Sequence, residues 1–187
     1  PRSSYGLLVL HTHGHGDHVA ADAQFDGRPD TVVVSADRDT AWPHLGLTGP
    51  GSASHVDLGG RVLDCLATPG HHEAAVTFYD RHTGLLFTGD TVYRGRLYVN
   101  DWPAFVHTID LLVAFAATRP VTHVLGCHIE MAGEPGEDYL IGTTFQPGEP
   151  PLQMTVGHLH AVRAAIIEIG DRTGRHVFDD FIICRLP

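Results

Sequence analysis

The residues best suited to chemistry stand together in one short segment of the chain. His13, His15 and Asp17 are spaced two apart, and His18 follows directly. Residues two apart in a segment that leaves a strand point to one side, so these side chains can converge. Imidazole and carboxylate groups are ligands that suit zinc, iron or manganese. Because four such ligands are more than one ion uses comfortably, the segment predicts a site for two neighbouring divalent ions.

The elements that would position this segment follow from hydrophobic periodicity. Short apolar or β-branched runs predict strands at residues 5–10, 31–35, 61–67, 74–79, 85–88, 121–125 and 177–184. Apolar residues at spacings of three and four predict helices at residues 102–117 and 159–169, with shorter helical segments at 19–23 and 37–44. Stretches rich in Gly, Ser and Pro predict loops at residues 46–60 and 130–151. Since strands and helices alternate without a repeat or a linker, we expect one α/β domain over residues 1–187.

The segment around His13 resembles the HxHxDH signature of the metallo-β-lactamase superfamily. Later motifs occur in that family's order, as TPGH at residues 68–71, FTGD at 87–90 and GCH at 126–128. The resemblance implies an αβ/βα four-layer sandwich. In this family a hairpin or more of sheet normally precedes the signature, whereas a single apolar run precedes it here. We therefore expect the N-terminal strands of the first sheet to be incomplete.

The resemblance also implies a ligand set for two ions. The first ion would be bound by His13, His15 and His71, the second by Asp17, His18 and His128, and Asp90 would bridge the two. An aspartate at the bridging position is typical of the broad dinuclear hydrolases, such as glyoxalase II and lactonases. Dedicated zinc β-lactamases usually place Cys or Ser there.

The implied activity is that of a dinuclear metallo-hydrolase, with zinc as the expected ion and iron or manganese as alternatives. Two ions about 3.5–4 Å apart can share a water and lower its pKa towards ~7. The resulting hydroxide would attack an ester, thioester, lactone or amide bond of a small molecule, and Asp17 would orient it as the catalytic residue. A mononuclear iron persulfide dioxygenase, a β-lactam-hydrolysing enzyme and a non-catalytic scaffold stay open as alternatives.

Candidates for substrate binding follow the bridging aspartate. Two arginines and two tyrosines there could bind an anionic or aromatic group, although surface arginines with packed tyrosines fit the pattern equally well. The loop at residues 130–151 is expected to shape the mouth of the pocket. The candidate residues are Tyr93, Arg94, Arg96, Tyr98 and Tyr139.

Several further residues compete for a role in the site. His72 adjoins His71, but the residue directly after Thr-Pro-Gly is the ligand in the family, which favours His71. We expect Cys127 to be a buried structural thiol and His11 to support the site or pack in the core. His158, at a helix start, is expected to be a surface or capping residue.

The composition limits the possible partners. The chain has 187 residues, with 12 arginines and no lysine against 22 acidic residues, for a formal net charge of −10. No basic run could neutralise phosphates, which argues against nucleic acid, and no apolar stretch approaches the ~20 residues that a membrane span needs. Three widely spaced cysteines and the lack of a visible signal peptide favour the cytoplasm. The expected partner is a small-molecule substrate, and a homo-oligomer stays open.

Overall fold

The protein is described by a computed structural model that places residues 5–187. The largest sheet is six-stranded and carries most of the site. In spatial order its strands are β3 (Ala53–Asp57), β4 (Val62–Ala67), β5 (Val76–Asp80), β6 (Leu85–Gly89), β8 (His123–Gly126) and β9 (Gln153–Met154). All neighbours are antiparallel except β6 and β8, which run parallel. This parallel pair brings the ends of β6 and β8 to the same edge of the sheet.

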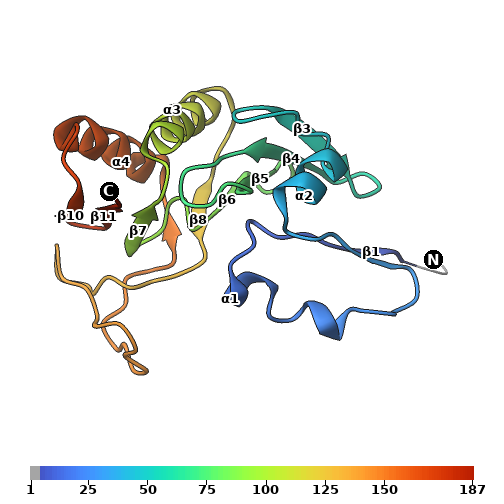
Figure 1. The fold of residues 1–187 in the computed structure, drawn as a ribbon, viewed down its shortest axis with the longest axis horizontal. Coiled ribbons are helices and arrows are strands. Elements are labelled where there is room, and N and C mark those ends of the chain that lie inside the picture. Colours follow the sequence, from blue (N-terminus) through green and yellow to red (C-terminus); the bar gives the residue numbers. More distant parts are fainter. Residues whose placement is uncertain (1–4) are drawn as a thin grey trace.

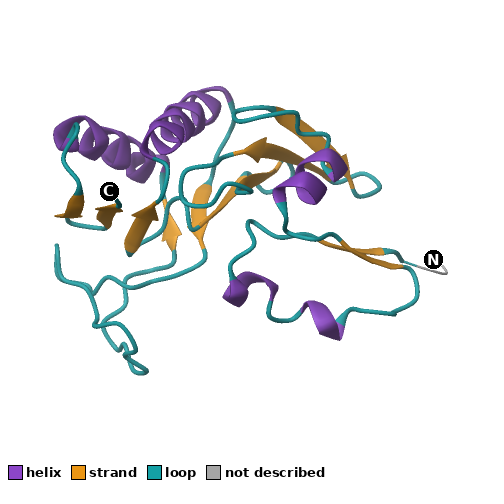
Figure 2. Cartoon of the chain, viewed as in Figure 1, coloured by secondary structure: helices purple, strands orange, loops and turns teal. Residues whose placement is uncertain are grey.

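Two smaller sheets flank the large one (Figures 1 and 2). The first pairs β1 (Leu7–Val9) in parallel with β2 (Thr31–Val33), and the connection between them contains α1 (Gly16–Val19) and a short 3₁₀ helix (Asp22–Gln24). The second has the order β10 (Gly174–Val177), β11 (Ile182–Arg185) and β7 (Arg96–Val99). No helix within residues 5–187 is both long and apolar enough to cross a membrane.

The two faces of the large sheet are covered differently. Helices α3 (Trp102–Thr118) and α4 (Val156–Ile169) pack on one face, where Phe105, Ile109 and Leu112 are fully buried. Figure 1 shows the two helices side by side above the strands. On the other face α2 (Arg38–His44) packs Trp42 against β4 and β5. Burial of a large apolar side chain contributes about 1.5–3 kcal/mol, so α3 holds its end of the sheet firmly.

Most predicted elements are confirmed, and the errors have physical causes. The expected loop at residues 46–60 contains β3, whose alternating burial marks a half-exposed edge strand that its Ser and Gly content conceals. Strand β7 was not predicted, and the expected strand at 177–184 is two strands, β10 and β11, joined by a turn. The run at 31–35 forms a shorter strand, β2, and although the run is apolar and β-branched, Val32 is 52% exposed.

The hairpin between β5 and β6 is fastened by one buried carboxylate. Asp80 has no exposed surface. Its Oδ1 accepts a hydrogen bond from the backbone N–H of His82, and its Oδ2 accepts from Arg61 and from the Thr83 hydroxyl. Arg61 chiefly, with Thr83 and His82, outweighs the effect of burial and lowers the pKa of Asp80.

This hairpin predicts a pH-dependent contribution to stability. A carboxyl titrates near 3.9 in an unfolded chain, so a lowered folded pKa gives stability that is complete above that value and is lost as pH falls through the folded pKa. We expect Asp80→Asn to lower the free energy of unfolding at pH 7, and the deficit relative to wild type to shrink at pH 3. Urea unfolding at both pH values measures this, with Asp110→Asn, which disrupts an exposed ion pair, as the control. A deficit that is the same at pH 7 and pH 3 contradicts it.

Candidate metal centre

The structure brings together all seven side chains that the sequence predicts as metal ligands. They come from segments that follow the ends of β1, β4, β6 and β8, including the first turns of α1. Two groups form around the bridging candidate: His13, His15, His71 and Asp90 in one, and Asp17, His18 and His128 in the other. Residues far apart in the sequence therefore meet at one edge of the fold. Their roles as ligands stay a prediction.

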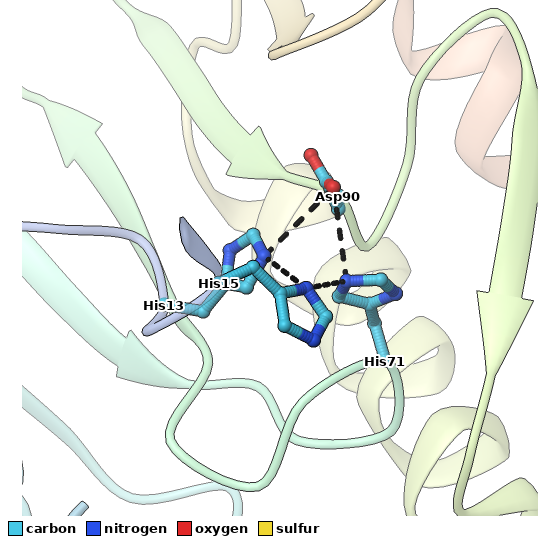
Figure 3. Close-up of side chains that lie close together, drawn as sticks. All are labelled: His13, His15, His71 and Asp90. Atoms are coloured by element: carbon cyan, nitrogen blue, oxygen red, sulfur yellow. Dashed lines mark hydrogen bonds and ion pairs between the residues drawn. The ribbon is translucent and has the colours of Figure 1, made fainter. Parts of the chain in front are cut away.

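The first group is compact (Figure 3). His15 Nδ1 lies 3.0 Å from His13 Nε2 and 3.1 Å from His71 Nε2. Asp90 Oδ2 lies 3.8 Å from His13 Nε2 and 3.7 Å from His71 Nε2. Ligand atoms about 2.1 Å from a tetrahedral ion are about 3.4 Å from one another. The spacing of the four atoms is close to that of a tetrahedral ligand set.

The hydrogen bonding of these histidines also fits a cation. His71 Nδ1 lies 2.8 Å from the Tyr98 carbonyl oxygen, which can only accept, so Nδ1 carries the proton and Nε2 presents a lone pair. His15 Nδ1 faces both His71 Nε2 and His13 Nε2 but has at most one proton to donate. Within residues 5–187, His18 Nε2 is buried with no hydrogen-bond partner. A divalent cation would accept these lone pairs, and a carbonyl on the far ring nitrogen is a common support for a histidine ligand.

The second group shares one carboxylate oxygen with the first. Asp17 Oδ2 lies 3.5 Å from His18 Nε2 and 3.4 Å from His128 Nε2. Asp90 Oδ2 lies 3.4 Å from His18 Nε2 and 3.3 Å from His128 Nε2. The same oxygen is thus near nitrogens of both groups, as a bridging ligand must be.

Burial and neighbouring charges shift the pKa values of several side chains in the site. Burial, together with His18, lowers the pKa of His13 to about 3, so this ring is neutral at pH 7. Burial likewise lowers the pKa of His71, against the opposing effect of the Tyr98 carbonyl. Burial opposes ionisation of Asp90, but the histidines led by His128 outweigh it and lower its pKa. Neutral His13 and His71 beside an ionised Asp90 are in the protonation states that metal binding needs, whereas the hydrogen bond from His128 to Asp90 raises the pKa of His128.

The structure also shows the surroundings of the other residues that were considered for a role in the site. His72 is outside both groups, and its Nδ1 accepts a hydrogen bond from the backbone N–H of Ala74. His11 joins the Val34 carbonyl to Asp22, and His158 is part of the cap at the start of α4. The expectation that Cys127 is buried is wrong.

Cys127 is exposed because it lies at the rim of the site, at the end of β8. Its Sγ is within 4.8 Å of the ligand atoms of His18 and Asp90. Desolvation by the surrounding atoms, followed by the negative charge of Asp90, raises the thiol's pKa to about 11. The thiol is therefore protonated at neutral pH, which makes it a weaker candidate ligand than its histidine neighbours.

The candidate substrate residues separate into two sets. Tyr93 and Tyr98 line a cavity of about 450 Å³ beside the ligand groups. The guanidinium of Arg94 pairs with Asp180, and that of Arg96 pairs with Glu130 and Asp138. Tyr139 accepts a hydrogen bond from the backbone N–H of Gly148. Substrate binding by these five residues stays a prediction.

Three residues that line the cavity were missed from the sequence, the apolar Leu186 and the polar pair Asn100 and Glu130. Asn100 Nδ2 donates to the backbone carbonyl of His71. Neither polar residue stands in a recognisable motif, because Asn100 follows the unpredicted strand β7 and Glu130 begins a loop. Only the folded arrangement assigns them to the site.

A model of the Metallo-beta-lactamase superfamily matches residues 7–121. The chain belongs to this superfamily. It is 33% identical to a hydroxyacylglutathione hydrolase of Rhizobium meliloti over 57% of this chain and 43% of the relative. It is 31% identical to a hydroxyacylglutathione hydrolase of Rhodobacter capsulatus over 82% of this chain and 65% of the relative. The chain thus spans about half to two thirds of the length of these relatives.

The solved structures agree on the fold. ETHE1 from Myxococcus xanthus superposes with a TM-score of 0.55 at 20% identity, covering 89% of this chain and 69% of that one. At this identity the likeness shows the fold alone. The metallo-β-lactamase type of α/β fold expected from the sequence is confirmed, as is the likeness to the glyoxalase II branch of the superfamily.

Proposed function

We propose that this protein is a metal-dependent hydrolase that binds two divalent ions, with zinc expected, and cleaves a thioester or a related ester of a small molecule. The observation that carries the proposal is the position of Asp90 Oδ2, which lies 3.3–3.8 Å from four histidine nitrogens of the two ligand groups. The names of the two relatives, hydroxyacylglutathione hydrolase, support the thioester as the bond class.

The candidate ligands fall into two sets, one for each ion. His13, His15 and His71 would hold one ion, and Asp17, His18 and His128 the other, with Asp90 between them. Such ions supply Lewis acidity for the carbonyl oxygen and lower the pKa of water. The contribution of the protein is to fix these ligands in the protonation states and positions that the ions require.

Asp17 has the position that a catalytic carboxylate needs. Its side chain is 59% exposed and lines the cavity, while Asp90 is buried. One oxygen of Asp17 faces His18 and His128, and a carboxylate has a second oxygen that can accept a proton from water and orient it towards a carbonyl carbon. Tyr98 and Asn100 line the same cavity and would bind the leaving group.

Metal analysis combined with a substrate panel tests the proposal. We expect purified protein loaded with zinc to hold about two ions per chain and to hydrolyse thioesters, with lactones and β-lactams as comparison substrates. Removing the metal with a chelator should abolish turnover, and zinc should restore it. One iron per chain with oxygen consumption and no hydrolysis would instead identify a dioxygenase, and an inert metal-free protein would identify a scaffold.

A further inference from the structure

The wall of the metal cavity presents a carboxylate where a positive charge would be needed to bind an anion. Glu130, Tyr98 and Asn100 line the cavity together with the ligand residues Asp17 and His128. None of the described residues that line it is an arginine, and the chain has no lysine. Apart from histidines and bound metal, the cavity therefore offers an anionic substrate group no cation to pair with.

Both Nη atoms of Arg96, on strand β7 behind the cavity wall, are engaged elsewhere, while its buried Nε has no hydrogen-bond partner among the described residues. Arg96 and Tyr98 are two apart on β7 and so lie on one face of that strand. Arg96 Nη2 donates to Glu130 Oε1 at 2.7 Å, and its Nη1 donates to Asp138 Oδ2 at 2.8 Å and to the Tyr139 carbonyl at 2.7 Å. Paired hydrogen bonds between a guanidinium and carboxylates are strong and geometrically specific. The side chain of Arg96 is 11% exposed.

The Glu130 carboxylate is held by hydrogen bonds and packs against Gly95, which has no side chain. Its Oε2 accepts from the backbone N–H of Arg96 at 2.7 Å. A Cβ added to Gly95 would lie 2.6 Å from Glu130 Oε2 and 2.4 Å from the Tyr93 ring, so only glycine fits between them. The backbone N–H of Glu130 donates to the Arg94 carbonyl at 2.7 Å. Glu130 is therefore held in place from both its backbone and its side chain.

The ion pairs around Glu130 balance one another in charge. Arg175 donates to Asp138 at 2.7 Å, so the network contains two guanidinium groups, Arg96 and Arg175, and two carboxylates, Glu130 and Asp138. Of these four residues, only Glu130 lines the cavity. The one residue of this neutral network that lines the cavity among the described residues is therefore negatively charged.

We propose that Glu130 determines specificity: it favours substrates whose leaving group is neutral or cationic and disfavours those whose leaving group carries a carboxylate. The inference rests on the proposed hydrolase function and deepens it. It assigns this chain a leaving-group charge class different from that of the glutathione thioester named in its relatives. A unit charge at about 6 Å in a partly hydrated site changes affinity about tenfold, which sets the size of the expected effect.

Arg38, in a pocket that adjoins the site, serves as a control. Arg38 lines a neighbouring pocket that shares His71 and Asn100 with the metal cavity. Its guanidinium stacks over the Trp42 ring at 4.8 Å, and the same pocket contains the acidic residues Glu73 and Asp101. Replacing Arg38 should therefore leave the charge preference of the metal cavity unchanged.

Three acetyl thioesters whose thiols carry different charges test the inference on the zinc-loaded protein. They are acetylthiocholine, S-acetyl-N-acetylcysteamine and S-acetylglutathione. We expect wild type to have a higher kcat/KM for the first two than for the third. Glu130→Gln should raise the ratio for S-acetylglutathione over the neutral thioester about tenfold, whereas Asp110→Asn on the surface and Arg38→Met should not change it. A wild type that prefers S-acetylglutathione, or an unchanged ratio in Glu130→Gln, overturns the inference.

A binding measurement tests the charge preference independently of whether the protein hydrolyses thioesters. Calorimetry compares S-methylglutathione with its diethyl ester on zinc-loaded wild type and Glu130→Gln. We expect wild type to bind the diester more tightly and Glu130→Gln to reduce that preference about tenfold. If no thioester is hydrolysed but this preference is found, the hydrolase function fails and the charge selection stands. Equal preference in both proteins overturns the charge selection even if thioesters are hydrolysed.

Discussion

Replacing Asp90 by alanine should remove the second metal ion and nearly all turnover. Asp90 Oδ2 is the oxygen near nitrogens of both ligand groups, at 3.4 Å from His18 Nε2 and 3.8 Å from His13 Nε2. Loss of a residue that only orients a ligand typically costs 10–100-fold. Loss of a shared ligand should cost more, so we expect kcat/KM to fall about 10³-fold or further. Metal content should fall from about two ions per chain to about one or fewer.

The measurement pairs elemental analysis with kinetics under zinc-saturating conditions. Asp110→Ala is the matched control, since it removes an aspartate whose ion pair with Arg163 is exposed on the surface. That variant should keep both its metal content and its turnover. If Asp90→Ala keeps two ions per chain and wild-type turnover, the bridging role of this carboxylate is wrong.

The candidate ligand residues could be identified from the sequence because their signals are local. The spacing of His13, His15 and Asp17 and the short motifs that end in His71 and Asp90 each lie within a few residues. Their convergence depends on which strands are neighbours, and that follows from the family's fold. The parallel pairing of β6 with β8 is what brings His128 to Asp90.

The cavity wall could not be predicted because its contacts are long-range. Arg96 lies 34 residues from Glu130 and 42 from Asp138, and nothing in the local sequence of either partner signals the pairing. The arginines after Asp90 were therefore open to interpretation as anion-binding groups. Strand β3 escaped prediction for a different reason, because one face of an edge strand is exposed to solvent and its composition resembles that of a loop.

Replacing Gly70 by alanine should destabilise the protein and disturb the metal centre at the same time. Gly70 has a φ of +140°, a conformation that L side chains rarely adopt. An added Cβ would lie 2.6 Å from the Cα and 2.8 Å from the backbone nitrogen of Phe105. A rotamer change cannot relieve contacts with the backbone of α3. The carbonyl of Gly70 also accepts hydrogen bonds from the backbone N–H groups of Asn100 and Asp101, and the next residue is His71.

The expected cost of Gly70→Ala combines two effects, backbone strain of about 1–3 kcal/mol and overpacking of about 1–3 kcal/mol. Gly60→Ala separates them, because Gly60 also has a positive φ, +105°, but among the described residues no atom outside its two chain neighbours lies within 4 Å of its added Cβ. We expect Gly60→Ala to lose about 1 kcal/mol in urea unfolding with its metal content unchanged. Gly70→Ala should lose about 2–6 kcal/mol and bind zinc more weakly, since α3 must move away from the turn that positions His71. If the two variants lose the same free energy of unfolding and bind zinc equally well, the close approach of Gly70 to α3 does not set the position of His71.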